Sequence, residues 1–220
     1  MTPVLTKTYG TLPLRRAEIL RYARCPNGTA PPLLEECIAE AEAAAEPGRV
    51  CYRIFDLAER DGALDLGFAT TTSAALRRNL QDCCRVLVFA ATAGLAFDRL
   101  ISRYSRLSVT KSLFFQAIGT ERVEAICDRF CADMAQELGG LRPRFSPGYG
   151  DLPLALQTPL TRALDCARRA GITLNESLLM TPSKSVTAIA GIMPDTRETT
   201  EQTAPCARCA AADCAYRRDT

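Results

Sequence analysis

Apolar side chains recur along the chain with two kinds of spacing, and each predicts a different element. Residues 85–92, RVLVFAAT, form a continuous apolar run of strand length, which is typical of a buried central strand. Residues 49–57 alternate less regularly and predict a second strand, with residues 63–68 as its hairpin partner. Residues 172–177 and 185–193 predict two shorter strands near the end of the chain.

Spacings of three and four residues predict helices between these strands. The clearest helix begins after Thr120 as a cap and ends at Gly139-Gly140, and its apolar stripe faces one side. The residues of that stripe are Val123, Ile126, Phe130, Met134 and Leu138. A separate helix over 108–119 is expected to end at Gly119. The other predicted helices cover 13–24, 33–46, 72–83, 93–107 and 155–170.

Helices and strands are intermixed without a clean alternation of strand, helix and strand, which favours an α+β fold. We expect a single domain over residues 1–195, with a twisted, mostly antiparallel or mixed sheet packed by helices. A chain of 220 residues suits one domain with an appendage. The appendage is residues 196–220, a polar, Cys-rich C-terminal tail that we expect to be flexible.

Composition and charge narrow the classes of function. The net charge is +2, so no strong field recruits nucleic acid or a membrane surface, and no apolar run approaches the roughly 18 residues of a membrane helix. The start, MTPVLTKTYG, lacks the apolar stretch of a signal peptide, which predicts a cytoplasmic protein. Histidine is absent, and its absence removes Ser-His and Cys-His nucleophile pairs and every His-metal site.

The stretch RFSPGYGDLP, residues 144–153, combines turn-forming residues with groups that bind ligands. Pro147-Gly148 forces a tight turn in which glycine allows positive φ and a close approach of the backbone. Arg144 offers a planar fork suited to a carboxylate, and Tyr149 offers an aromatic face with a polar tip. These local features leave two interpretations open: a plain connection between helices, or a turn that holds a ligand.

The wider sequence resembles one known family. RFSPGYG resembles the Arg-Pro-Ala-Pro-Gly-Tyr segment of the activation domain of cobalamin-dependent methionine synthase. NESLLMTPSKSVTAIAGIMPD resembles the Thr-Glu-Ser, Met-x-Pro and Ser-Val block of that domain, at a similar distance from the turn. ILRYARC and VLVFAATAGLAFDRLISRY look like stand-alone members of the family, so the resemblance extends to about residue 195.

The resemblance implies a function in which positioning matters more than acid–base chemistry. Activation domains of this family bind S-adenosylmethionine in a shallow groove and present its methyl group to cobalamin, whose rescue from cob(II)alamin also needs an electron donor. This chain has no histidine for an Asp-x-His-x-x-Gly cobalt ligand, so the cobalamin would be carried by a separate methionine synthase or other corrinoid protein. The chain would then be the activation component of a methyltransferase system without a catalytic triad of its own.

The resemblance also assigns residues. Arg144 would face the carboxylate of the methyl donor, Ser146 takes the alanine position of the motif, and Tyr149 would lie beside the reactive end. Glu124, in ERVEAICD, matches the helix glutamate that meets the amino group of the donor. Its i+4 neighbour Asp128 is a like charge, so ordinary helix pairing does not explain Glu124, although a solvated glutamate remains an alternative.

The chain also departs from the family pattern. The motif continues as GDLPLALQ instead of a Pro-acid-His segment, and Glu198 stands where the family has a ligand-contacting tyrosine. An aspartate contact near the start of the domain has no clear counterpart. Lys184 and Ser185, in the MTPSKSV turn, are open to a ligand or a partner, but a solvated lysine is the simpler interpretation.

The three tail cysteines, Cys206, Cys209 and Cys214, follow a Cys-x2-Cys-x4-Cys spacing that suits a shared metal. A [4Fe–4S] cluster or Zn²⁺ would need a fourth ligand, and the alternative is a disordered tail with reactive thiols. The candidates for that ligand are Cys25, Cys37, Cys51 or a residue of a partner. Two functions therefore stand beside the leading one: a redox or metal protein that delivers electrons through the tail, and a non-catalytic adaptor for a corrinoid protein.

Overall fold

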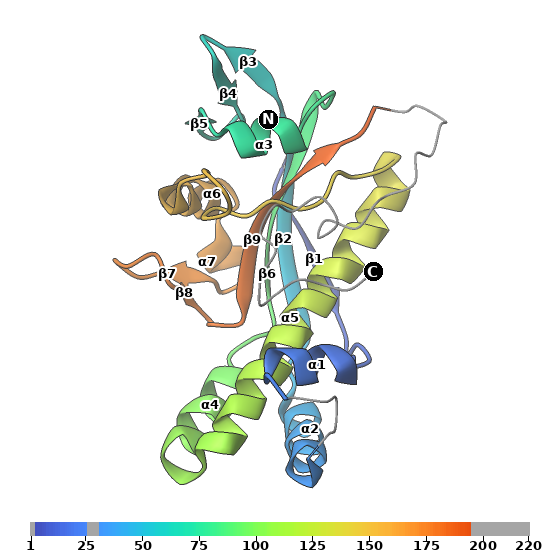
Figure 1. Ribbon diagram of the computed structural model, residues 1–220. Helices are drawn as coiled ribbons and strands as arrows, with labels where there is room; N and C mark the ends of the chain where they lie inside the picture. Colours follow the sequence, from blue (N-terminus) through green and yellow to red (C-terminus); the bar gives the residue numbers. More distant parts are fainter. Residues whose placement is uncertain (1–2, 26–30, 195–220) are drawn as a thin grey trace.

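The computed structural model describes residues 3–25 and 31–194, and its centre is a four-stranded sheet (Figure 1). Every neighbouring pair in this sheet is antiparallel, and the strand order is β1-β2-β6-β9. The strands are β1 (Leu5–Tyr9), β2 (Gly48–Asp56), β6 (Arg85–Thr92) and β9 (Ser185–Ile192). Helices pack against the sheet, which confirms the predicted α+β fold with a mostly antiparallel sheet.

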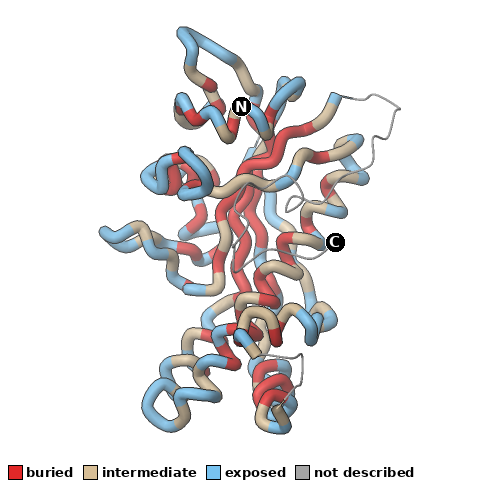
Figure 2. The backbone as a smooth tube through the Cα atoms, viewed as in Figure 1, coloured by how far each residue is buried: buried red, intermediate tan, exposed pale blue. Residues whose placement is uncertain are grey.

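Strand β6 is buried on both faces, which explains why its sequence is a continuous apolar run (Figure 2). Leu87, Phe89 and Ala91 belong to one apolar cluster, whereas the alternate residues of the same strand belong to a second cluster on the opposite face. The sheet therefore separates two cores, each covered by its own layer of helices.

The first core lies under the long helix α5 (Val109–Leu138), and Figure 1 shows this helix running along one face of the sheet. Phe130 of α5 packs its ring against Phe89 and Tyr52, with centroid distances of 4.9 and 5.1 Å. Of the predicted apolar stripe, all residues but Leu138 are buried. Helices α1 (Arg16–Tyr22), α2 (Pro32–Ala44) and α4 (Ala96–Leu107) complete this layer.

The prediction of two helices over 108–139 is wrong, because α5 runs through Gly119 without a break. A side chain at Gly119 would lie 2.9 Å from the ring of Phe97 of α4, so the missing Cβ lets the two helices approach closely. Thr120 is not a cap, since its hydroxyl donates to the Gln116 carbonyl inside the helix. The N-cap is Ser108, and Gly139 ends the helix at a φ of 83°, as predicted.

The second core is covered by shorter helices on the other face of the sheet (Figure 1). The predicted helix over 155–170 is interrupted at Asp165, which has a φ of 49° and separates α6 from α7. Cys166 follows this break, and its sulfur lies 3.7 Å from that of Cys51 on β2. The elements of this layer are α3 (Ala74–Asn79), the short 3-10 turn η2 (Leu154–Leu156), α6 (Gln157–Ala163) and α7 (Cys166–Arg169).

Two small sheets extend from the main one. Residues 63–68 do not pair with the strand at 49–57 as predicted, because β2 already lies between β1 and β6. Instead β4 (Ala63–Asp65) pairs with β3 (Ala58–Arg60) and β5 (Thr70–Thr71). The strand in the region predicted at 172–177 is shorter than expected: it is β7 (Thr173–Leu174), which pairs with β8 (Met180–Thr181).

The Cys-rich tail, including the three tail cysteines and Glu198, lies outside the described residues, so the domain boundary near residue 195 stays a prediction. Among the helices of residues 3–25 and 31–194, none combines the length and the apolar character that crossing a bilayer requires.

Candidate functional site

The segment that follows α5 is attached to the edge of the main sheet at β9. The amide of Phe145 donates to the carbonyl of Ile189 at 2.8 Å, and the Ile189 amide returns the bond at 2.8 Å. Phe145 packs against the second core. Neighbouring side chains of an extended segment point to opposite sides, so Arg144 is directed towards α5.

The predicted turn at Pro147-Gly148 is confirmed. The amide of Tyr149 donates to the Ser146 carbonyl at 3.0 Å, with proline at the second position and Gly148, at a φ of 91°, at the third. This is the arrangement of a type II turn. Tyr149 is 59% exposed, and its ring meets that of Phe145 edge-on at 6.1 Å. The turn thus presents an aromatic side chain and a glycine backbone at the surface.

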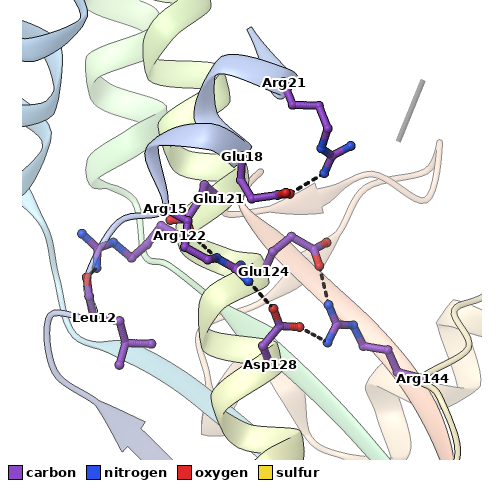
Figure 3. A network of polar contacts seen from close by, with 9 residues as sticks. All are labelled: Leu12, Arg15, Glu18, Arg21, Glu121, Arg122, Glu124, Asp128 and Arg144. Carbon is purple, nitrogen blue, oxygen red and sulfur yellow. Dashed lines mark hydrogen bonds and ion pairs between the residues drawn. The ribbon is translucent and has the colours of Figure 1, made fainter. Parts of the chain in front are cut away.

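Arg144 joins the turn to helix α5 through two ion pairs (Figure 3). Its Nη1 donates to Asp128 Oδ1 at 2.7 Å, and its Nη2 donates to Glu124 Oε2. The three side chains are only 21%, 22% and 31% exposed for Arg144, Glu124 and Asp128. Glu124 is therefore a partner of Arg144, and the alternative of a plain solvated glutamate is wrong.

The same carboxylates connect to the N-terminal segment. Asp128 Oδ2 accepts from Arg15 Nη1 at 2.8 Å, and Arg15 Nε donates to Glu121 Oε1 at 2.8 Å (Figure 3). Glu121 is fully buried, and its Oε2 has no hydrogen-bond partner in the described part of the chain. We call Glu121, Glu124 and Asp128 the acid cluster. Arg15 and Arg144 pair with these carboxylates, and the charge of Arg122 also acts on Glu121.

Arg15 and Glu121 were missed from the sequence. One signal was available for the glutamate: residues 121, 124 and 128 recur at spacings of three and four, which places three acids on one side of a helix. No comparable signal exists for Arg15, which lies 106 positions from Glu121 along the chain.

Lys184 is half-buried and held on α5, which corrects the simpler interpretation of a solvated lysine. Its Nζ donates to Gln116 Oε1 at 2.6 Å and to Thr120 Oγ1 at 3.1 Å. Burial lowers the pKa of Lys184 below its ordinary value, and the charge of Asp98 opposes that shift. Ser185 is buried, with its hydroxyl 2.7 Å from the Pro182 carbonyl, so it contributes to the turn itself.

The thiols near the site are structural. Burial raises the pKa of Cys127 and of Cys131, which lie behind Arg144 on α5, so both stay protonated at neutral pH. Within residues 3–25 and 31–194, no three Cys, Asp or Glu side chains are grouped as metal ligands. Of the candidates for a fourth ligand to the tail cysteines, Cys37 and Cys51 are fully buried, whereas Cys25 is half-buried.

The fold and these contacts define a class: an α+β domain in which one long helix lies across an antiparallel sheet and a charged turn from the sheet edge meets that helix. Within this class the chain is similar to a solved structure described as the crystal structure of the MetH reactivation domain bound to AdoHcy, with a TM-score of 0.61. The two chains are 15% identical over 90% of this chain and 80% of the other. The chain therefore has the fold of a reactivation domain, the fold that the sequence resemblance implied.

No protein-family model matches the sequence, and no curated protein matches it either.

Proposed function

We propose that this protein binds S-adenosylmethionine and acts as the activation component of a separate corrinoid-dependent methionine synthase or related corrinoid protein. One observation carries the proposal. Glu124 and Arg144 are the two charged residues that the family resemblance selects, and they meet in an ion pair although 20 positions separate them. They do so in a chain with the fold of a domain that is described as bound to AdoHcy, the demethylated form of the proposed donor.

The charges suit this ligand. S-adenosylmethionine carries an ammonium and a sulfonium group against a single carboxylate, so it has one positive charge in excess. The three carboxylates of the acid cluster lie close together on one helix, where they offer negative charge to the ammonium end of such a ligand. In this proposal Glu124, supported by Asp128, accepts hydrogen bonds from the ammonium group. The turn at 146–149 borders the rest of the ligand, and Gly148 leaves space for its approach.

Both terminal nitrogens of Arg144 already bind carboxylates of the protein, so its first role is to orient Glu124 and Asp128. Tyr149 stands beside the turn, where its ring would lie next to the reactive end of the donor. Transfer of a methyl group from a sulfonium needs no proton transfer by the protein. The contribution of these residues is to position the donor, which is compatible with a chain without histidine.

The cobalamin belongs to the partner in this proposal, and it supplies the nucleophile when the two proteins meet. Reductive activation also needs an electron donor. The three tail cysteines remain a candidate for a Zn²⁺ or Fe–S site, with all-thiolate ligation as the chemistry available to a chain without histidine.

The test is calorimetric titration of the full chain with S-adenosylmethionine and with S-adenosylhomocysteine. Glu124→Gln should weaken both ligands about 10- to 150-fold, the effect of losing a hydrogen bond to a charged group. Glu137→Gln is the matched control, because Glu137 lies on the same helix, is 53% exposed and pairs with Lys7 away from the acid cluster. If the wild-type chain binds neither ligand, alone or with a corrinoid protein, the proposal is rejected.

A further inference from the structure

Lys184 is a half-buried cation whose hydrogen-bond partners are neutral. Both acceptors, Gln116 Oε1 and Thr120 Oγ1, carry no charge. Within residues 3–25 and 31–194, no carboxylate lies within ion-pair distance of its Nζ. The charge of Asp98 acts on Lys184, but the two carboxylate oxygens of Asp98 accept hydrogen bonds from the amide of Ser183 at 3.1 and 3.2 Å.

The surroundings hold this cation in one place. The Thr120 hydroxyl donates to the Gln116 carbonyl, so its oxygen is left to accept from the lysine. A Cβ at Gly119 would lie 3.0 Å from Lys184 Cγ, so the stem of the lysine packs on the bare helix backbone at that glycine. An ammonium group has three N–H donors. Two are used on neutral acceptors, which leaves one donor without an acceptor among the described residues.

Lys184 contacts the same side of α5 on which Glu124 of the acid cluster lies. Gln116, Thr120 and Glu124 are spaced four residues apart and form one stripe along the helix. Thr120 and Glu124 are separated by about 6 Å along the helix axis. The stripe thus places a positive group at one turn and the carboxylate of Glu124 at the next turn.

From this arrangement, and resting on the proposed function, we propose that Lys184 binds the carboxylate of the methyl donor while Glu124 binds its ammonium group. The ligand class is an α-amino acid attached to a nucleoside through sulfur. The sequence resemblance gave the carboxylate to Arg144. To take it, Arg144 would have to release Glu124 or Asp128, whereas Lys184 has a donor left and, in the part of the chain that the structure describes, no ion pair to break.

The test compares two ligands that differ only in this carboxylate: S-adenosylhomocysteine and its decarboxylated analogue, which keeps the amine, the sulfur and the nucleoside. The full wild-type chain should bind S-adenosylhomocysteine about 10- to 150-fold more tightly than the analogue. In Lys184→Met the preference should fall to about threefold or less, and in Lys184→Arg most of it should return. Lys111→Met is the control, because Lys111 also lies on α5 but pairs with Glu36 at 3.2 Å.

The outcomes separate the two proposals. If wild type binds neither compound, the proposed function fails and this inference fails with it. If wild type prefers S-adenosylhomocysteine and Lys184→Met keeps that preference, or loses affinity equally for both compounds, only the role of Lys184 is wrong. If Arg144→Lys loses the preference for S-adenosylhomocysteine and Lys184→Met keeps it, the residue that binds the carboxylate is Arg144. Lys184→Gln, which keeps a polar end on Gln116 and Thr120, replaces the methionine variant if that variant does not fold.

Discussion

Replacing Arg144 with lysine tests whether the ion pairs between the turn and α5 stabilise the fold as well as orient the site. The guanidinium group bonds two carboxylates with two different nitrogens, Nη1 to Asp128 and Nη2 to Glu124. A lysine at this position keeps the charge but offers a single ammonium on a flexible stem, so it can replace one of these bonds and not the planar pair. Asp128 retains the hydrogen bond from Arg15.

The size of the effect follows from burial. All three side chains are less than one third exposed, so the bond that is lost is stronger than a surface ion pair. A hydrogen bond to a charged group contributes about 1.5–3 kcal/mol, and partial exposure places this one at about 1.5–2 kcal/mol. For a chain of 220 residues, that loss lowers the midpoint of thermal unfolding by about 3–8 °C.

Urea unfolding followed by far-UV circular dichroism measures the free energy directly. Arg129→Lys is the matched control, since Arg129 lies on α5, is 60% exposed and pairs with Asp133 within the same helix. We expect the control to stay within about 0.5 kcal/mol of wild type. If Arg144→Lys is as stable as Arg129→Lys, the ion pairs at the turn do not stabilise the fold and the argument from their burial is wrong.

Three further predictions concern the core, the lysine and the tail. Gly48→Ala should cost about 1–3 kcal/mol, because the new Cβ would overlap Ile126 Cδ1, and Ile126→Val, which lacks that atom, should recover part of the loss in the double variant. The pKa of Lys184 is lower in the folded chain than its unfolded value of 10.5, so between these two values the unfolded chain binds more protons. In that pH range the unfolding free energy of wild type minus that of Lys184→Met should therefore rise with pH, and above it the difference should stay constant. Replacing the three tail cysteines with serine should reduce the iron and zinc content of anaerobically purified protein to background without changing calorimetric binding of S-adenosylhomocysteine; equal metal content in both proteins would contradict a metal site in the tail.

The features that could be predicted from sequence are those that local chemistry decides. The apolar run of β6, the stop at Gly139 and the turn at Pro147-Gly148 each depend on residues within a few positions of one another. The predictions from sequence were wrong where contacts with a distant segment determine the local structure. The pairing of residues 63–68 failed because β1 and β6 already occupy both edges of β2. The break at Asp165 lies inside a segment with good helical periodicity, and only its left-handed backbone marks it.

In the candidate site, too, the sequence could indicate individual residues but not the long-range contacts between them. The family resemblance selected Glu124 and Arg144, but it gave each of them a ligand group as partner and did not indicate that they pair with each other. That contact depends on how the extended segment after α5 lies along β9, which no local pattern records. Lys184 was read as solvated because a lysine in a polar turn usually is. Its burial follows from Gly119, 65 positions earlier in the chain, whose bare backbone makes room for the stem.

The incorrect prediction of a helix end at Gly119 and the site proposed here are connected. If the helix had ended at Gly119, with Thr120 as the cap of a second helix, Thr120 and Glu124 would lie on a different axis from Gln116. No continuous stripe could then carry a lysine contact and an acid cluster one turn apart. The glycine instead stays helical, because the absence of a side chain lets Phe97 on α4 and the stem of Lys184 pack against α5. One small residue inside a 30-residue helix therefore lets α4 and the β8–β9 turn pack closely on α5, and it keeps Lys184 in line with Glu124, the two groups of the proposed amino acid site.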